Sequence, residues 1–244
     1  MTDRGLKQTR YEKRLDHSPV TRFLHSVRYR NLVRVVGELT RQRGGAPIRI
    51  LDVGSGAGRA FAVLDPLLAI DYAGVEMRGR MCMVAGERFG DRPNFAIHRG
   101  LIEDRLDLID AADLVIALET FEHMAEASVA ALLERAAGAG IDALYCTVPN
   151  EVGPAVAIKN IGSAAIGYRR HREYRWRDTF HAAAYRLDKV PPHTGGHRGF
   201  DWRKLERTIR GRFDIEAIHG SPYDWVPRAV SPSIGFLCRP RSAQ

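Results

Sequence analysis

The stretch Ile48-Arg-Ile-Leu-Asp-Val-Gly-Ser-Gly-Ala-Gly-Arg59 decides the fold of this chain. Four of its first six residues are apolar, as in a buried strand, and Asp52 is the only acid. Gly54, Gly56 and Gly58 then alternate with small residues, and glycine lets a backbone turn tightly and approach a ligand closely. The spacing differs from the dinucleotide-binding pattern, in which the third glycine follows the second by three residues. We therefore expect a strand that ends in a ligand-binding turn of another type.

Strand-like and helix-like segments alternate around this stretch, which is typical of a parallel sheet covered by helices on both faces. The expected strands are 48–53, 71–76, 94–98, 113–118 and 141–148, and the expected helices are 58–68, 78–90, 126–138 and 201–210. Two final apolar runs, 213–218 and 233–237, predict strands that pair as an antiparallel hairpin, because the connection between them is short.

Two segments lie outside this alternation. Residues 1–46 predict a basic tail and a helix that starts at Ser18-Pro19, packs against the sheet and forms a lid over the ligand pocket. Residues 47–244 form the main domain, but about fifty residues, 150–199, stand where a short link is usual. We interpret this segment, which includes a run of Arg, Tyr and Trp, as a substrate-binding insertion.

The composition excludes several classes of protein. The chain has 244 residues, a net charge of +8 and no apolar run that approaches the roughly 20 residues needed to span a bilayer. The polar, basic start does not resemble a secretory signal, and three scattered cysteines form no disulfide or zinc pattern. We therefore expect a cytoplasmic protein. Its positive charge indicates either attraction to RNA, anionic lipid or an acidic substrate, or a solvated arginine-rich surface.

A second acid, Glu76, ends the second expected strand 18 residues after Gly58. Together with the strand, Asp52 and the three glycines, it resembles the first motifs of class I S-adenosylmethionine (SAM) methyltransferases. The resemblance implies a Rossmann-like α/β fold with a seven-stranded, mostly parallel sheet, an antiparallel C-terminal hairpin and helices on both faces. It also implies SAM as the cofactor.

The same resemblance assigns roles around the cofactor. The glycines would contact its methionine part, Glu76 would accept both ribose hydroxyls, and Asp52 would either face the ammonium group or cap the turn. Leu101 stands where many relatives have an acid, so Leu101 and Ile102 would cover the adenine. The cofactor residues implied in this way are Asp52, Gly54, Ser55, Gly56, Gly58, Glu76, Met77, Leu101, Ile102 and Glu119.

The motif Glu119-Thr-Phe-Glu122-His123 follows the fourth expected strand. It resembles that of the ubiquinone-pathway O-methyltransferases and of the small-RNA 3′-terminal 2′-O-methyltransferases. In the RNA group the two glutamates, the histidine and a later histidine bind a divalent metal. His197 is the corresponding fourth ligand here, with His193 as its substitute. Mg²⁺ or Mn²⁺ would lower the pKa of a bound hydroxyl.

The roles of two further sets of residues remain open: those of Glu122-His123 in this motif and that of Asn150. Without a metal, Glu122-His123 would cap a helix and line the pocket, and His123 or His197 would be the general base. Asn150 is either a substrate ligand or a turn residue beside Pro149. The other residues expected to bind substrate are Tyr168, Trp176 and His193.

The sequence thus predicts a SAM-dependent methyltransferase (EC 2.1.1.-), which methylates a hydroxyl of a small or lipid-like molecule. The apolar start of the insertion and its arginines would allow peripheral contact with an anionic membrane. The alternatives are an RNA 2′-O-methyltransferase, for which the interleaved Arg, Tyr and Trp residues are suited, and a non-catalytic SAM- or RNA-binding protein.

Overall fold

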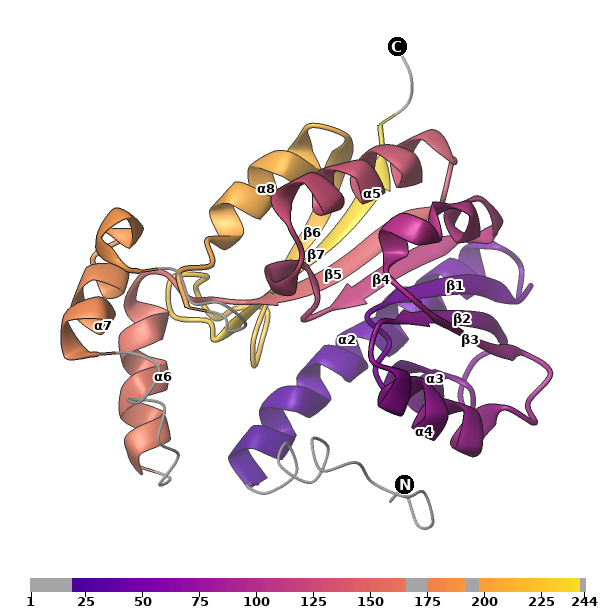
Figure 1. Ribbon diagram of the computed structural model, residues 1–244, viewed down its shortest axis with the longest axis horizontal. Helices are drawn as coiled ribbons and strands as arrows, with labels where there is room; N and C mark the ends of the chain where they lie inside the picture. The colour runs from indigo at the N-terminus through magenta and orange to yellow at the C-terminus, as the bar shows by residue number, and fades with distance from the viewer. Residues whose placement is uncertain (1–18, 166–174, 192–197, 242–244) are drawn as a thin grey trace.

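The computed structural model describes residues 19–165, 175–191 and 198–241, and it shows a seven-stranded sheet with helices on both faces (Figure 1). The strands are β1 (Ile48–Val53), β2 (Ile70–Glu76), β3 (Phe95–Arg99), β4 (Leu114–Leu118), β5 (Ala143–Pro149), β6 (Phe213–Gly220) and β7 (Ser233–Pro240). The α-helices are α2 (Pro19–Gln42), α3 (Arg59–Leu64), α4 (Gly79–Phe89), α5 (Glu126–Gly138), α6 (Pro154–Ala165), α7 (Trp176–Ala183) and α8 (Trp202–Arg210). Short 3₁₀ helices are η1 (Ile102–Asp104), η2 (Leu106–Ala111), η3 (Phe121–His123) and η5 (Leu187–Lys189).

The strands lie in the order β3-β2-β1-β4-β5-β7-β6. Strands β1 to β5 are parallel, and β7 runs antiparallel to both β5 and β6. The predicted sheet, including its C-terminal hairpin, is confirmed. β1 pairs with both β2 and β4, so the winding of the sheet reverses beside β1. Ligands of open α/β sheets bind at the carboxyl ends of the strands at such a point.

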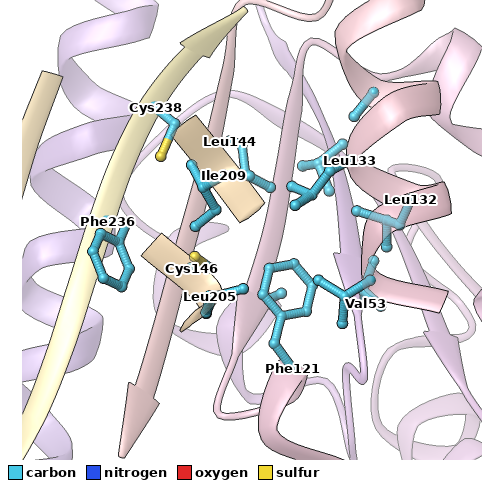
Figure 2. Packing of buried hydrophobic residues seen from close by; sticks show 14 of the residues in the cluster. Val53, Phe121, Leu132, Leu133, Leu144, Cys146, Leu205, Ile209, Phe236 and Cys238 are labelled. Carbon is cyan, nitrogen blue, oxygen red and sulfur yellow. The ribbon is translucent and has the colours of Figure 1, made fainter. Parts of the chain in front are cut away.

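Two layers of apolar side chains hold the helices on the sheet. On one face α2 and α3 bury side chains such as Leu32, Val36 and Phe61. On the other face α5 and α8 contribute Leu133 and Ile209, among others, to the cluster in Figure 2. Burial of apolar surface on both faces is the main stabilising term for such a layered fold. The prediction that the N-terminal helix packs against the sheet is confirmed, whereas Ser18 lies outside the described residues.

Ion pairs link the C-terminal end of α2 to the amino-terminal ends of β4 and β5. Arg43 Nη2 lies 2.8 Å from Asp113 Oδ1, and its Nε lies 2.7 Å from Asp142 Oδ2. Arg49 Nη2 lies 2.5 Å from the same oxygen of Asp113. Burial alone would raise the pKa of Asp113, but hydrogen bonds from Arg49 and the two arginine charges lower it. The carboxylate therefore stays ionised and paired.

The segment predicted to be an insertion contains α6, α7 and η5, which project from one end of the sheet (Figure 1). Val156, Ala182 and Val190 form a small apolar cluster of their own. Lys159 Nζ, on α6, lies 2.5 Å from the buried carboxylate of Glu151 and donates to the carbonyl oxygen of Asn150 at 3.2 Å. These contacts attach α6 to the end of β5. None of the described helices is long and apolar enough to cross a membrane.

Candidate functional site

The glycine turn after β1 is built from left-handed backbone. Gly54, Gly56 and Gly58 have φ angles of 77°, 56° and 75°, which favour glycine because they strain residues with a Cβ. A Cβ on Gly54 would lie 2.5 Å from Thr120 Oγ1, so this glycine lets the residue after Glu119 come close. A Cβ on Gly56 would meet no described atom within 4 Å. The turn is therefore compact toward β4 and open at Gly56, as a cradle for a ligand requires.

Ser55 lies inside the same turn. It is buried, and its Oγ has no hydrogen-bond partner among the described residues. A Cβ on Gly74 of β2 would lie 2.6 Å from this Oγ, so Gly74 provides the space that the serine fills. A buried hydroxyl without a partner is rare in native proteins and needs an explanation. A polar group of a bound ligand would satisfy it.

Glu76 ends β2 with its carboxylate buried against the turn. Oε2 accepts from Gly56 N at 3.0 Å, and Oε1 accepts from Arg78 N and Arg78 Nε at 2.8 and 3.0 Å. The carboxylate thus lies at the position predicted for the ribose-binding acid. The Arg78 side chain that donates to this carboxylate is itself 57% exposed.

Apolar side chains flank this acid where adenine binding was predicted. Met77 is 65% exposed and Leu101 is 47% exposed, although both are large hydrophobic residues. Ile102 is instead part of the hydrophobic core, so its side chain is not available on the surface to cover a base. Exposed apolar groups at the ends of two neighbouring strands are suited to a flat ligand ring. Met77 and Leu101 therefore remain the candidates for adenine contact.

Asp52 is enclosed one residue before the end of β1. Its Oδ2 accepts a hydrogen bond from Tyr72 Oη. Burial raises the pKa of Asp52 to about 7, the Tyr72 hydrogen bond opposes this shift, and the charge of Glu76 adds to it. The sequence analysis did not predict this hydrogen bond between Tyr72 and Asp52. The predicted approach of Asp52 to the cofactor ammonium group stays a prediction.

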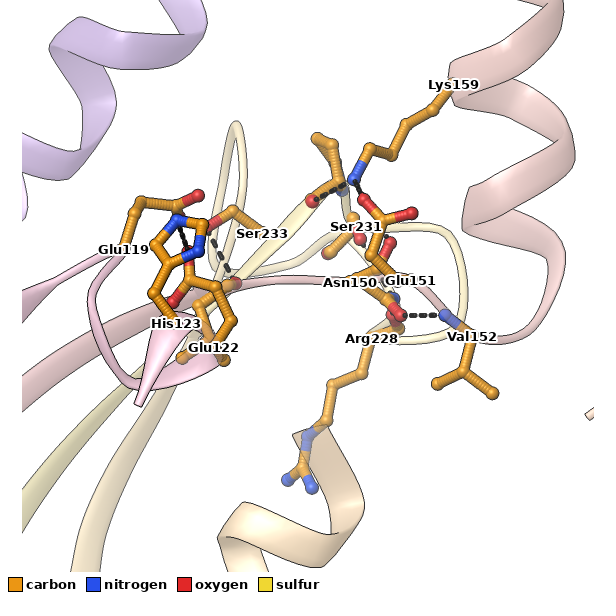
Figure 3. Close-up of polar contacts among 12 residues, drawn as sticks. Glu119, Glu122, His123, Asn150, Glu151, Val152, Lys159, Arg228, Ser231 and Ser233 are labelled. Atoms are coloured by element: carbon orange, nitrogen blue, oxygen red, sulfur yellow. Dashed lines mark hydrogen bonds and ion pairs between the residues drawn. The ribbon is translucent and has the colours of Figure 1, made fainter. Parts of the chain in front are cut away.

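Glu119 lies directly after β4, beside the glycine turn. Its φ is 54°, an unusual value for a residue with a Cβ, and such strain is found more often at functional sites. Oε1 lies 3.0 Å from Arg28 Nη2 of α2. The same oxygen accepts from Ser233 Oγ of β7 at 2.9 Å (Figure 3). Arg28 and Ser233 are site residues that the sequence analysis missed, since no motif marks either of them.

Glu122 and His123 follow on η3 (Figure 3). The Glu122 side chain is fully buried, the His123 side chain is 45% exposed, and Nε2 of the histidine lies 4.0 Å from Glu122 Oε1. A fully buried carboxylate therefore lies next to a half-exposed histidine. Glu122 also adds to the raised pKa of Cys146, for which burial is the larger cause.

The predicted metal site is not assembled by the described residues. Within them, no group of three or more His, Cys, Asp or Glu side chains could hold a metal ion. His197 and its substitute His193 lie outside the described residues. The donor set itself also fits a metal poorly, because the guanidinium of Arg28 already neutralises Glu119. A second cation next to this group would be repelled.

The residues expected to bind substrate have separate outcomes. For Asn150 the structure favours the turn-residue alternative, because its fully buried amide donates to the carbonyl oxygens of Arg228 and Ser231 at 2.8 and 3.0 Å (Figure 3). Its Oδ1 accepts from Val152 N, as a turn residue does. Trp176 is 75% exposed at the start of α7. Tyr168 lies outside the described residues.

Comparisons with known proteins agree with this geometry. Residues 50–139 match a family described as a methyltransferase domain. A comparison with curated proteins finds no match.

Magnesium protoporphyrin IX methyltransferase (ChlM) from Synechocystis PCC 6803 is similar in structure, with a TM-score of 0.56 and 12% identity, over 97% of this chain and 90% of that one. The methyltransferase domain of bacterial CtHen1-C has a TM-score of 0.61 and 14% identity, over 90% and 100% of the two chains. At such identities the likeness shows the fold, which is the Rossmann-like methyltransferase fold predicted from the sequence.

Proposed function

We propose, from this fold and the matched methyltransferase domain, that the protein is a SAM-dependent methyltransferase. The observation that carries the proposal is the left-handed turn at Gly54, Gly56 and Gly58, with the Glu76 carboxylate bonded to Gly56 N. The open backbone at Gly56 and the buried, unpartnered hydroxyl of Ser55 fit the methionine part of SAM. Glu76 fits the ribose, and Met77 and Leu101 fit the adenine.

Bound SAM supplies a methyl group on a positively charged sulfur. The chain must bring an acceptor oxygen in line with that carbon, exclude water and take the acceptor's proton. Glu119, beside the turn, is oriented by Arg28 and Ser233. His123 is the described group suited to take the proton, because its imidazole is exposed and the buried Glu122 carboxylate stabilises the imidazolium that forms.

We further propose that the acceptor is a hydroxyl of a small or lipid-like molecule. Large apolar side chains are exposed on α6 and α7, where the insertion leaves the sheet: Ile158, Ile161, Trp176 and Phe180. Such a surface favours an apolar acceptor or contact with an anionic membrane, to which the net positive charge is suited.

RNA is the second candidate acceptor. Tyr223 and Trp225 stack at 5.6 Å between ring centroids, and Trp225 is mostly exposed, so this aromatic pair offers a platform for a base. The net charge of +8 would attract the phosphate backbone. Binding that weakens steeply with salt would favour RNA, and binding that is insensitive to salt would favour the small acceptor.

The test has two stages. The first measures binding of SAM and of its demethylated product, S-adenosylhomocysteine (SAH), by calorimetry, and absence of both would overturn the proposal. The second incubates the full chain with methyl-labelled SAM and separate pools of phenols, lipids and RNA. Label in an ether of a phenol or lipid is expected. Label in RNA would support the second candidate, and SAM binding without label in any pool would indicate a non-catalytic binding protein.

A further inference from the structure

A small cavity lined by both polar and apolar groups lies between α2 and strands β5, β6 and β7. Its volume is about 20 Å³, which is enough for one water molecule or one hydroxyl group. The residues that line it include Arg28 of α2, Tyr145 and Thr147 of β5, His219 of β6, and Ser233 and Gly235 of β7. The cavity is distinct from the glycine turn, which lies after β1.

Three buried polar atoms belong to side chains that line this cavity. Tyr145 Oη, Thr147 Oγ1 and His219 Nε2 have no hydrogen-bond partner in the part of the chain that the structure describes. All three residues are at least nine-tenths buried. Buried polar groups in native proteins are almost always paired. Three unpaired groups on side chains that line one cavity therefore favour a polar ligand in it.

The chemistry of the three groups favours a neutral ligand that can both donate and accept hydrogen bonds. The hydroxyls of Tyr145 and Thr147 can each do either. His219 Nδ1 lies 3.1 Å from Arg34 Nη2, a donor, and 3.1 Å from Asp224 Oδ1, an acceptor. The tautomer of His219 therefore decides whether Nε2 donates or accepts. A hydroxyl satisfies either tautomer, whereas a cation or an anion does not.

Two lining residues connect the cavity to the candidate active site. Arg28 Nη2 lies 3.0 Å from Glu119 Oε1, and Ser233 Oγ donates to the same oxygen at 2.9 Å. Glu119 in turn lies one residue before Thr120, whose side chain adjoins Gly54 of the cofactor turn. Arg28 and Ser233 thus line the cavity and also contact Glu119.

We propose that this cavity is a hydroxyl-binding subsite, occupied by water in the free protein and by one hydroxyl of the methyl acceptor in the complex. The inference rests on the proposed function, because it assigns the ligand's hydroxyl to the methyl acceptor. It names a hydroxylated acceptor as the substrate class, and it places part of the recognition site beneath α2 rather than in the insertion.

The test uses methanol as the smallest probe that carries an acceptor-like hydroxyl. Crystals of the full chain with SAH are solved before and after a methanol soak. We expect one water in the cavity before the soak. After the soak we expect the methanol oxygen within hydrogen-bond distance of Tyr145, Thr147 and His219. A cavity that stays empty, or that holds only water after the soak, would overturn the subsite.

Two variants sharpen the result. Gly235→Ala would place a Cβ 3.3 Å from Tyr145 Oη and so reduce the space, and we expect methanol occupancy to be lost. Gly138→Ala, on α5, is the matched control, because its Cβ would meet no described atom within 4 Å. Thr147→Val keeps the shape but removes one partner, and Thr208→Val on α8 is its control. Full methanol occupancy in both Gly235→Ala and Thr147→Val would contradict the proposal.

SAH binding separates this inference from the proposed function. Both cavity variants should bind SAH within twofold of the unaltered protein, because neither residue lies at the glycine turn. If the unaltered protein binds no SAH but the cavity accepts methanol, the proposed function fails while the hydroxyl site stands. If SAH binds normally and methanol is excluded, only the subsite is lost.

Discussion

Arg28 of α2 and Glu119 at the end of β4 form an ion pair of 3.0 Å, although 91 positions separate them in the chain. Both side chains are largely shielded from solvent, so the charges are screened less than in a surface pair. Through this pair the N-terminal helix holds a carboxylate beside the glycine turn.

Arg28→Gln should therefore reduce the rate of methyl transfer more than it weakens the binding of SAH. We expect label transfer to the accepted pool to fall about tenfold or more, because Glu119 loses the charge that orients it. Loss of a hydrogen bond to a charged group should lower the free energy of unfolding by about 2 kcal/mol. Calorimetry should show SAH affinity within threefold of the original. Arg30→Gln, an exposed position on the same helix, is the control, and equal effects in both variants would contradict the role of Arg28.

Chelation tests whether Arg28 or a metal supplies the positive charge at Glu119. We expect the rate of label transfer to be unchanged in excess EDTA, because the guanidinium already neutralises the carboxylate. Loss of activity in EDTA, with recovery on addition of Mn²⁺ or Mg²⁺, would instead show that the reaction needs a metal, which the predicted ligands Glu119, Glu122, His123 and His197 would hold.

Glu76→Ala should weaken binding of SAH. The carboxylate is the predicted acceptor for the ribose hydroxyls, and hydrogen bonds to a charged group are worth about 2 kcal/mol, or about 30-fold in the dissociation constant. Arg78→Ala should change the affinity by less than threefold, because an ion pair made by an exposed arginine contributes little. Glu134→Ala, at an exposed position on α5, is the control for calorimetry. Undiminished binding by Glu76→Ala would rule out the ribose role.

Asp52 should make the protein less stable as the pH rises. Its pKa is raised to about 7 in the folded state, against about 3.9 in an unfolded chain. The folded state therefore keeps a proton that the unfolded state loses, and the free energy of unfolding falls between about pH 4 and pH 7.

Asp52→Asn should remove this dependence and stabilise the protein by about 1–3 kcal/mol at pH 8, with little effect near pH 4. Asparagine still accepts from Tyr72. Urea unfolding at both pH values measures the effect, and Asp71→Asn, exposed on β2, is the control. A stabilisation that is equal at both pH values would refute the assigned cause.

Lys159→Met should weaken the attachment of the insertion to the sheet. The change leaves the buried carboxylate of Glu151 without its lysine, and breaking such a pair typically costs about 3 kcal/mol or more. Thermal unfolding should show a lower midpoint than in Lys204→Met, an exposed control. Adding Glu151→Gln to Lys159→Met should recover part of the loss. No recovery in the double variant would show that packing, and not the charge, is responsible.

The alternation of apolar runs and turns predicts all seven strands. For β1, β4 and β5 the apolar pattern is strong because parallel strands are covered on both faces. For β6 and β7 it is the two final apolar runs and their short connection that indicate the hairpin. Helix α3 is shorter than predicted, since the segment after Leu64 turns toward β2. The two helices α6 and α7 fall inside a segment for which no helical boundaries had been predicted. Their small cluster around Val156 and Ala182 depends on tertiary contact.

The site was predictable only where a short motif encodes it. The glycine turn and Glu76 are close in sequence and are read directly from the spacing. Arg28 and Ser233 reach Glu119 from opposite ends of the chain, and no local pattern records such a contact. Asn150 shows that a sequence pattern can also be ambiguous, because a polar residue at the end of a strand is equally suited to bind a ligand or a backbone carbonyl. Only the structure shows that it binds Arg228 and Ser231.

Helix α2 is secured at both ends of β4, by Arg28 at the carboxyl end and by Arg43, the residue after the helix, at the amino end. Between these points it covers one face with fully buried leucine and valine side chains. A truncation that began at β1 would therefore leave a broad apolar face uncovered, and such a surface promotes aggregation. Designs for expression or for fusion to a tag should accordingly preserve the first helix intact, even when only the cofactor-binding half of the molecule is wanted.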